Sequence, residues 1–98
     1  MRRYFFHLCE QERSAIDHEG TDLPNDESAR AHAIAGIRSI LAEDLRDGGT
    51  INLMGTIDVL TTDGVVRFVV EFGDAVTIEG YRARVSGVGP DASGRKRI

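Results

Sequence analysis

The sequence has a single cysteine and no long apolar run. One cysteine among 98 residues cannot form an internal disulfide, so nothing here indicates an oxidising compartment. No apolar stretch approaches the ~20 residues that a membrane-spanning helix needs. The start of the chain has two arginines followed by the short, partly polar run YFFHLCE, which lacks the apolar segment of a signal peptide. We therefore expect a cytoplasmic protein without a membrane partner.

The overall composition is typical of one globular domain. The chain is 41% hydrophobic and 29% charged, and its length suffices for one core. Residues 1–79 hold seven arginines and fifteen acidic residues, a net charge of −8, whereas residues 80–98 hold five basic and one acidic residue, a net of +4. We expect a single domain over 1–79 and a glycine-rich, basic, partly mobile tail over 80–98. The acidic body disfavours nucleic acid, so only the basic tail offers a route to it.

An amphipathic helix is predicted in the middle of the chain. Asn25 or Asp26 can cap its start, because a short side-chain oxygen accepts a hydrogen bond from an unpaired backbone N–H. Gly48 suits the left-handed position that ends a helix. Between them, apolar residues recur at spacings of three and four and form one stripe: Ile34, Ile37, Leu41 and Leu45.

Two β-hairpins flank this helix. In the second, Asp63-Gly64 between β-rich runs predicts a two-residue type I′ turn. The resulting register points three pairs toward the core: Thr61 with Val66, Val59 with Phe68, and Ile57 with Val70. In the first, a turn around residues 11–14 pairs YFFHLCE with AIDHEG, which sets Cys9 opposite Ile16 and His7 opposite His18.

The predicted fold is therefore α+β, with the order ββαββ and one helix packed on one face of an antiparallel sheet. Apolar periodicity selects the core side of each element. The expected core comprises Tyr4, Phe6, Leu8, Ile34, Ile37, Leu41, Leu45, Ile57, Val59, Phe68, Val70 and Phe72. Phe5 is expected on the other side of the sheet, together with His7 and Cys9.

The chain resembles a family of short proteins that is common in alphaproteobacteria, especially rhizobia and their relatives, and is known only as a domain of unknown function. The resemblance runs from about Arg3 to Ala75. Its most specific parts are Tyr4-Phe5-Phe6-His7 and the pattern Asp17-x-x-Gly20-x-x-Leu23-Pro24 before the helix. It implies a bacterial, cytoplasmic protein and brings no activity, cofactor or catalytic residue.

A looser, architectural resemblance links the chain to HicB-type antitoxins. The shared features are strands, then Asp22-Leu23-Pro24, then an alanine-rich helix over residues 29–35. That resemblance implies a regulator that binds a toxin or a nucleic acid, and it is the alternative to the function favoured below. The chain has no recognisable helix-turn-helix or ribbon-helix-helix.

The candidate metal ligands are His7, Cys9 and His18, on one face of the first hairpin. Thiolate and imidazole are good zinc ligands. The three residues nevertheless lack the closely spaced ligand pairs of the usual zinc motifs, so we predict no metal and no cofactor, with a metal-binding hairpin as the minor alternative. A Cys9–His7 nucleophilic pair lacks an orienting third group and an oxyanion hole, so we predict no enzyme.

One helix covers only one face of a sheet, and the other face here is half apolar. Its apolar residues are Phe5, Leu60, Val65 and Val69. We therefore expect a small non-catalytic module that uses this face for protein–protein interaction, forming a homodimer or binding another protein.

Overall fold

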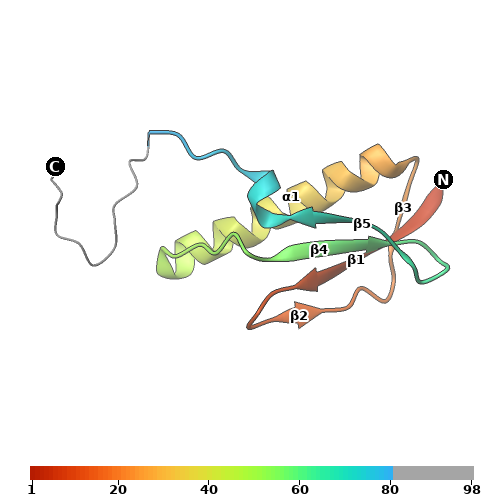
Figure 1. Ribbon diagram of the computed structural model, residues 1–98, viewed down its shortest axis with the longest axis horizontal. Helices are drawn as coiled ribbons and strands as arrows, with labels where there is room; N and C mark the ends of the chain where they lie inside the picture. The colour runs from red at the N-terminus through yellow and green to blue at the C-terminus, as the bar shows by residue number, and fades with distance from the viewer. Residues whose placement is uncertain (81–98) are drawn as a thin grey trace, which may run out of the picture.

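The computed structural model describes residues 1–80, so the expectation of a mobile tail lies almost wholly outside the described residues. The elements follow in the order β1 (Arg2–Cys9), β2 (Ser14–Ala15), β3 (Thr21–Leu23), α1 (Asp26–Gly48), β4 (Thr56–Leu60), β5 (Val66–Glu71) and the 3₁₀ helix η1 (Phe72–Ala75) (Figure 1). All pairings are antiparallel, in the order β2-β1-β4-β5, and β3 pairs with the other end of β1. The α+β fold is confirmed, with a fifth strand beyond the four expected.

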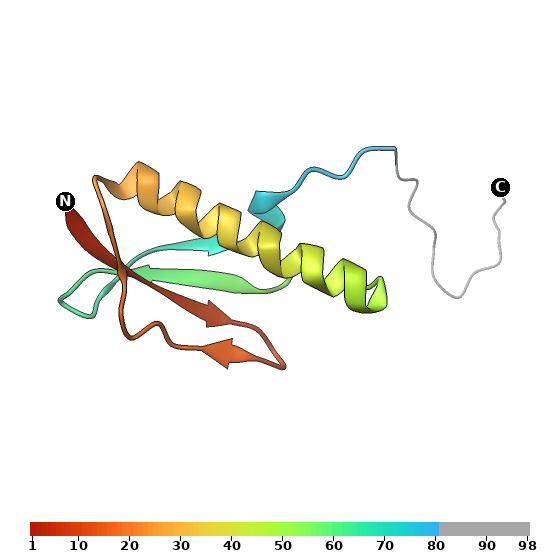
Figure 2. The same cartoon turned by 180° about the vertical axis from the view of Figure 1, so that it is seen from behind.

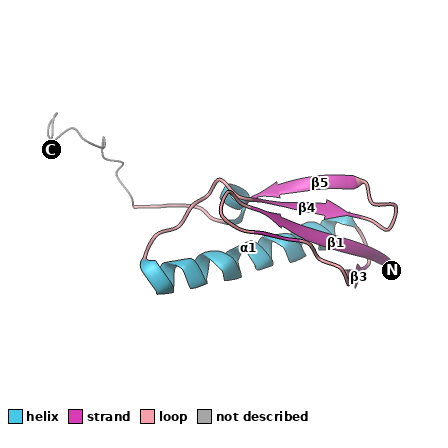
Figure 3. Cartoon of the chain, turned by 90° about the horizontal axis from the view of Figure 1, so that it is seen from below, coloured by secondary structure: helices cyan, strands magenta, loops and turns pink. Residues whose placement is uncertain are grey.

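Helix α1 lies along one side of the sheet (Figure 3). The predicted cap is confirmed: the Asn25 side chain accepts a hydrogen bond of 2.8 Å from the Ser28 N–H. The helix ends one residue later than predicted, because Gly49 rather than Gly48 has the left-handed conformation, with φ 72°. Within residues 1–80, no helix combines the length and the apolar character needed to cross a membrane.

The core lies between α1 and the sheet. Seven of the expected residues are buried: Tyr4, Ile37, Leu41, Ile57, Val59, Val70 and Phe72. Four others are partly buried around them, namely Phe6, Leu8, Ile34 and Phe68. Three alanines complete the buried set, Ala29 and Ala33 of α1 and Ala75 of η1, and their small side chains let the backbones come close together.

Leu45 was expected in the core and is 59% exposed, so this prediction is wrong. The physical reason is length. A helix of 23 residues is about 34 Å long, whereas strands of five to eight residues span about 17–26 Å. The last turns of α1 therefore extend past the sheet (Figure 1).

The register predicted for the first hairpin is also wrong. Cys9 pairs with Ser14 and Leu8 with Ala15, so His7 does not face His18. Between the pairs Leu8–Ala15 and Tyr4–Thr21, β1 spans four residues, whereas the opposite segment spans six. The extra residues form a loop over 16–20 between β2 and β3.

The Asp17 carboxylate fills the gap that this loop leaves in the ladder. It accepts hydrogen bonds from the backbone N–H groups of Phe6 (3.2 Å), Glu19 (3.2 Å) and Gly20 (3.0 Å). Burial alone raises the pKa of this carboxyl group, but the three N–H donors and the nearby His7 outweigh burial, and the pKa is lowered. Asp17 therefore stabilises the turn within this loop.

The second hairpin follows its predicted register only in part. Ile57 pairs with Val70 and Val59 with Phe68, as expected, and Asp58 pairs with Val69 between them. The next pair is Leu60 with Val66, because a β-bulge at Arg67 shifts the register. The turn is also different: the Gly64 N–H donates to the Thr61 carbonyl at 2.9 Å, so Thr62 and Asp63 are its central residues and Gly64 follows them with φ 79°.

Gly20 and Gly64 form a matched pair for testing the loop over 16–20. Both have positive φ, but a Cβ on Gly20 would lie 2.9 Å from the Tyr4 carbonyl oxygen, whereas one on Gly64 meets nothing within 4 Å. We expect Gly64→Ala to cost about 1 kcal/mol through backbone strain and Gly20→Ala about 2–4 kcal/mol through strain plus overpacking. Urea unfolding of both variants measures the difference, and equal losses would contradict the crowding at Gly20.

The Asp17 hydrogen bonds predict a specific pH dependence. Because the folded-state pKa is lowered, the stabilisation is complete above the unfolded value of about 3.9 and is lost as the pH falls through the folded value. We expect Asp17→Asn to lower the free energy of unfolding by about 1–3 kcal/mol at neutral pH. The gap between wild type and variant should narrow below about pH 4 in urea unfolding. A gap independent of pH would show that the charge of Asp17 is not what stabilises the loop.

Candidate functional site

The side of the sheet turned away from α1, here called the outer face, is the principal candidate site. Alternation along β1 places Phe5, His7 and Cys9 on it, opposite the buried Tyr4. On β4 the outward residues are Leu60 and Asp58, which pair with Phe5 and His7 respectively. Within the described residues no helix covers this face (Figure 3).

The outer face has an apolar half near the β4–β5 turn. We call Phe5, Leu60, Val66 and Val69 the apolar patch. Val66 and Val69 are 46% and 45% exposed. Val65 was expected on this face, but it precedes β5, and with Val66 turned outward the alternation of side chains no longer places it there. Phe5 and Leu60 face each other across β1 and β4 and are half-buried. Val66 was expected on the core side, and the bulge at Arg67 instead sets it opposite the outward Leu60.

The other half of the outer face is polar. The Cys9 thiol lies 3.7 Å from a carboxylate oxygen of Asp58. Desolvation of the sulfur and then the negative charge of Asp58 raise the pKa of this thiol. A raised pKa keeps the free thiol protonated, whereas a nucleophilic cysteine reacts as the thiolate.

The candidate metal ligands are not brought together. His7 and Cys9 lie on the outer face, and His18 lies in the loop over 16–20, outside the strand pairing that was to set it opposite His7. Among residues 1–80, no group of three or more histidine, cysteine, aspartate or glutamate side chains has an arrangement suited to a metal ion.

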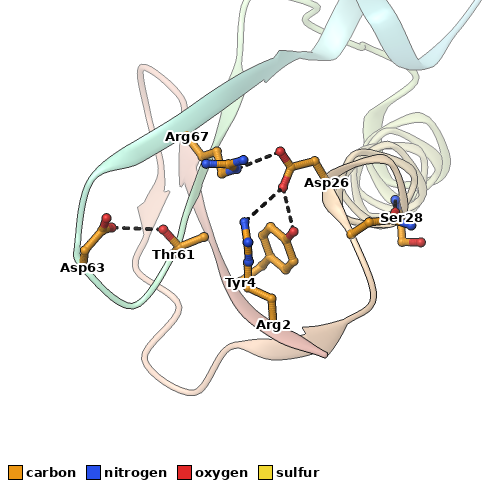
Figure 4. A network of polar contacts seen from close by, with 8 residues as sticks. Arg2, Tyr4, Asp26, Ser28, Thr61, Asp63 and Arg67 are labelled. Carbon is orange, nitrogen blue, oxygen red and sulfur yellow. Dashed lines mark hydrogen bonds and ion pairs between the residues drawn. The ribbon is translucent and has the colours of Figure 1, made fainter.

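A second polar cluster joins the start of α1 to the sheet, and the sequence did not reveal it. The Tyr4 hydroxyl donates to one Asp26 carboxylate oxygen at 2.6 Å, and Arg67 Nε donates to the other at 2.7 Å. Arg2 lies 3.9 Å from the same carboxylate. Figure 4 shows the three side chains converging on Asp26, which is the first residue of α1.

This cluster controls the ionisation of its own members. Hydrogen bonds from Tyr4 and then Arg67 lower the pKa of Asp26. The same hydrogen bond, followed by burial, raises the pKa of Tyr4. Because Arg2 and Arg67 both face the Asp26 carboxylate, the charges of this cluster are used within the domain, where they join the start of α1 to the sheet. The only sequence signal for it was an acidic residue in the first helical turn, which is equally explained by the helix dipole.

The bulge explains why Arg67 reaches this cluster. A classic bulge places two successive side chains on the same side of the strand. Arg67 and Phe68 are the bulged pair opposite Val59, so Arg67 joins the side that carries α1. In a regular strand Arg67 would instead face away from Asp26.

The fold, the outer face and the Asp26 cluster define a small α+β domain with one sheet face that no helix covers within the described residues. Comparison of the sequence with known families identifies the family of this domain. The chain belongs to the family described as Domain of unknown function (DUF6894), whose pattern matches residues 3–73. No curated protein and no solved structure matches the chain, so the HicB resemblance stays a prediction.

The Asp26 cluster predicts a measurable change in Tyr4 ionisation. We expect Asp26→Asn to lower the pKa of Tyr4 toward its ordinary value of about 10, because the carboxylate that disfavours the phenolate is gone. Spectrophotometric titration in a Tyr81→Phe background isolates Tyr4, since the chain has two tyrosines. Asp63→Asn removes a charge from the β4–β5 turn and serves as the control. Equal titration curves for Asp26→Asn and its parent would contradict the Tyr4–Asp26 hydrogen bond.

Proposed function

We propose that this protein is a small interaction module that binds a second copy of itself through the outer face. The observation that carries this proposal is the apolar patch, where Val66 and Val69 are 46% and 45% exposed beside Phe5 and Leu60. Adjacent apolar side chains on a face without a covering helix gain free energy when they leave water. The module acts by binding rather than by catalysis, in the bacterial cytoplasm.

The edges of the sheet are poor alternatives to its outer face. The Phe72 N–H donates to the Gly55 carbonyl at 2.9 Å, so the N–H of Glu71, the preceding residue, points away from β4 toward the open edge of β5. There the Asp74 carboxylate accepts it at 3.3 Å. The bulge at Arg67 disrupts the other end of the same edge. Caps and bulges of this kind protect edge strands from pairing with another chain.

The opposite edge of the sheet is protected as well. This edge is formed by β2 and β3, which pair with the two ends of β1 and are two and three residues long. Edge strands this short offer little to another chain. Between them, the Phe6 N–H of β1 donates to the Asp17 carboxylate. With one edge capped and the other very short, packing of one face on another is the association that the sheet favours. Two sheets pack in this way at a separation of about 10 Å.

A second copy is the partner that such a face fits most simply. A two-fold axis sets the apolar patch of one copy against the same patch of the other, and the assembly closes as a dimer. The four-stranded region measures about 15 by 17 Å, on the order of 250 Å². A standard interface buries about 800 Å² on each partner. We therefore expect a weak dimer that dissociates on dilution.

Val69→Lys tests this proposal. Val69 is at the centre of β5 on the outer face, and it is 45% exposed, so a lysine fits the isolated chain but places a charge in the dimer interface. We expect the wild type to show a concentration-dependent monomer–dimer equilibrium in analytical ultracentrifugation, and Val69→Lys to remain monomeric over the same range.

Ile16→Lys is the matched control. Ile16 is a similarly exposed apolar residue in the loop over 16–20, outside the apolar patch, so this variant should dimerise like the wild type. A wild type that is monomeric at every concentration would overturn self-association. Dimerisation of Val69→Lys with wild-type affinity would overturn the assignment to the outer face.

A further inference from the structure

The hairpin of β4 and β5 changes register at one point along its length. The pairing is regular as far as Val59 with Phe68, but the next pair is Leu60 with Val66, because Arg67 is left over as a bulge. The shift affects only the end of the hairpin that carries the turn, which lies at the same end of the domain as the start of α1 (Figure 2). Two residues of the apolar patch, Leu60 and Val66, are at this end.

The same sequence fits a second arrangement of this end, without a bulge. The observed turn has three residues, 62–64, the last of them in the left-handed conformation. Asp63-Gly64 alone is a favoured type I′ turn, and a turn of only these two residues would pair Leu60 with Arg67. The extra turn residue and the bulge compensate each other. The two arrangements therefore share the rest of the hairpin and differ only in residues 60–67.

The bulged form and the regular form present different side chains to the outer face. Because successive residues of a strand alternate between faces, the outward Leu60 lies beside Val66 in the bulged form and beside Arg67 in the regular form. In the bulged form Arg67 contacts Asp26 on the α1 side. In the regular form it would set a positive charge beside Phe5 and Leu60, and Val66 would turn toward the core side. The apolar patch is therefore complete only in the bulged form.

The contact between Arg67 and Asp26 favours the bulged form. Arg67 Nε donates to one Asp26 carboxylate oxygen at 2.7 Å, and the fully buried Tyr4 donates to the other at 2.6 Å, which holds the carboxylate in place. Hydrogen bonds between charged groups are stronger than neutral ones. Local pairing and burial favour the regular form instead, because the bulge interrupts the ladder and leaves Val66 46% exposed. A residue 41 positions away thus offsets a local cost.

We propose that Asp26 is a positioning residue for the outer face. By holding Arg67 on the α1 side, it keeps residues 60–67 in the bulged form and the apolar patch free of charge. Loss of this contact converts the end of the hairpin to the regular form and moves residue 67 onto the outer face. The register is a property of the single chain. Its consequence for association rests on the proposed function, and the two are measured separately.

Backbone nuclear Overhauser contacts, recorded in protein dilute enough to be monomeric, read the register. A contact from Leu60 to Val66 reports the bulged form, and a contact from Thr61 to Val66 reports the regular form. We expect the first contact in the wild type and in Arg67→Lys, and the second in Arg67→Glu, whose charge Asp26 repels. Exchange of the two charges, Asp26→Lys with Arg67→Glu, should restore the first contact.

Arg3→Glu is the matched control for the register. Arg3 also lies in a strand and pairs with an aspartate, Asp22 of β3, at 3.0 Å, and its side chain is 46% exposed, against 45% for Arg67. This variant should keep the contact from Leu60 to Val66. The same contact retained in Arg67→Glu would overturn the proposal, whatever the oligomeric state of the chain.

Analytical ultracentrifugation then measures the consequence for the outer face. The regular form of Arg67→Glu sets a charge beside Phe5 and Leu60, so we expect its dimer Kd to rise about tenfold or more, and that of Arg67→Lys to stay near the wild-type value. An unchanged Kd together with a changed register would overturn the effect on the outer face. A wild type that stays monomeric would overturn the proposed function alone, because the register is measured without the dimer.

Discussion

The rest of the fold depends on one hydrogen bond, which the Phe6 N–H donates to the Asp17 carboxylate. It lets two extra residues leave the strand pairing without an unpaired backbone group on β1. The pairing resumes with β3, so Leu23 lies opposite Arg2 and the chain enters α1 beside the start of β1. Asp26 is thereby brought to Tyr4. The D-x-x-G spacing thus has a physical role: Asp17 closes the gap, and Gly20 passes where a side chain would meet the β1 backbone.

The bulge in β5 is a second departure from regular pairing, and it contributes to the same contact between α1 and the sheet. The bulge in β5 turns Arg67 toward α1, where it meets the carboxylate that Tyr4 already contacts. The first residue of the helix is therefore joined to β1 and β5, which are not neighbours in the sheet. These two departures from regular pairing fix the angle and position of α1, and the same departures protect the edges of the sheet.

The sequence predicted the features that depend on local physics. The Asn25 cap, the apolar stripe of α1 and three pairs of the second hairpin follow from hydrogen-bonding capacity and periodicity. The bulge at Arg67 and the loop over 16–20 were missed, because each involves a distant partner: Asp26 is 41 residues from Arg67, and Phe6 is 11 residues from Asp17. Leu45 was misplaced because periodicity identifies the side of a helix but not the point where the opposing sheet ends. The same limit applies to the candidate metal site. Its prediction required a register of the first hairpin that set His18 opposite His7, and the observed register does not.

The proposed dimer joins two copies of the chain through the outer face. Intermolecular nuclear Overhauser effects in an equimolar mixture of ¹³C-labelled and unlabelled protein test this claim directly. We predict contacts between the methyl groups of Val69 or Leu60 in one copy and the Phe5 ring in the other. Contacts between copies that involve only the β5 edge or the carboxyl end of α1, or no contacts at any attainable concentration, would contradict it.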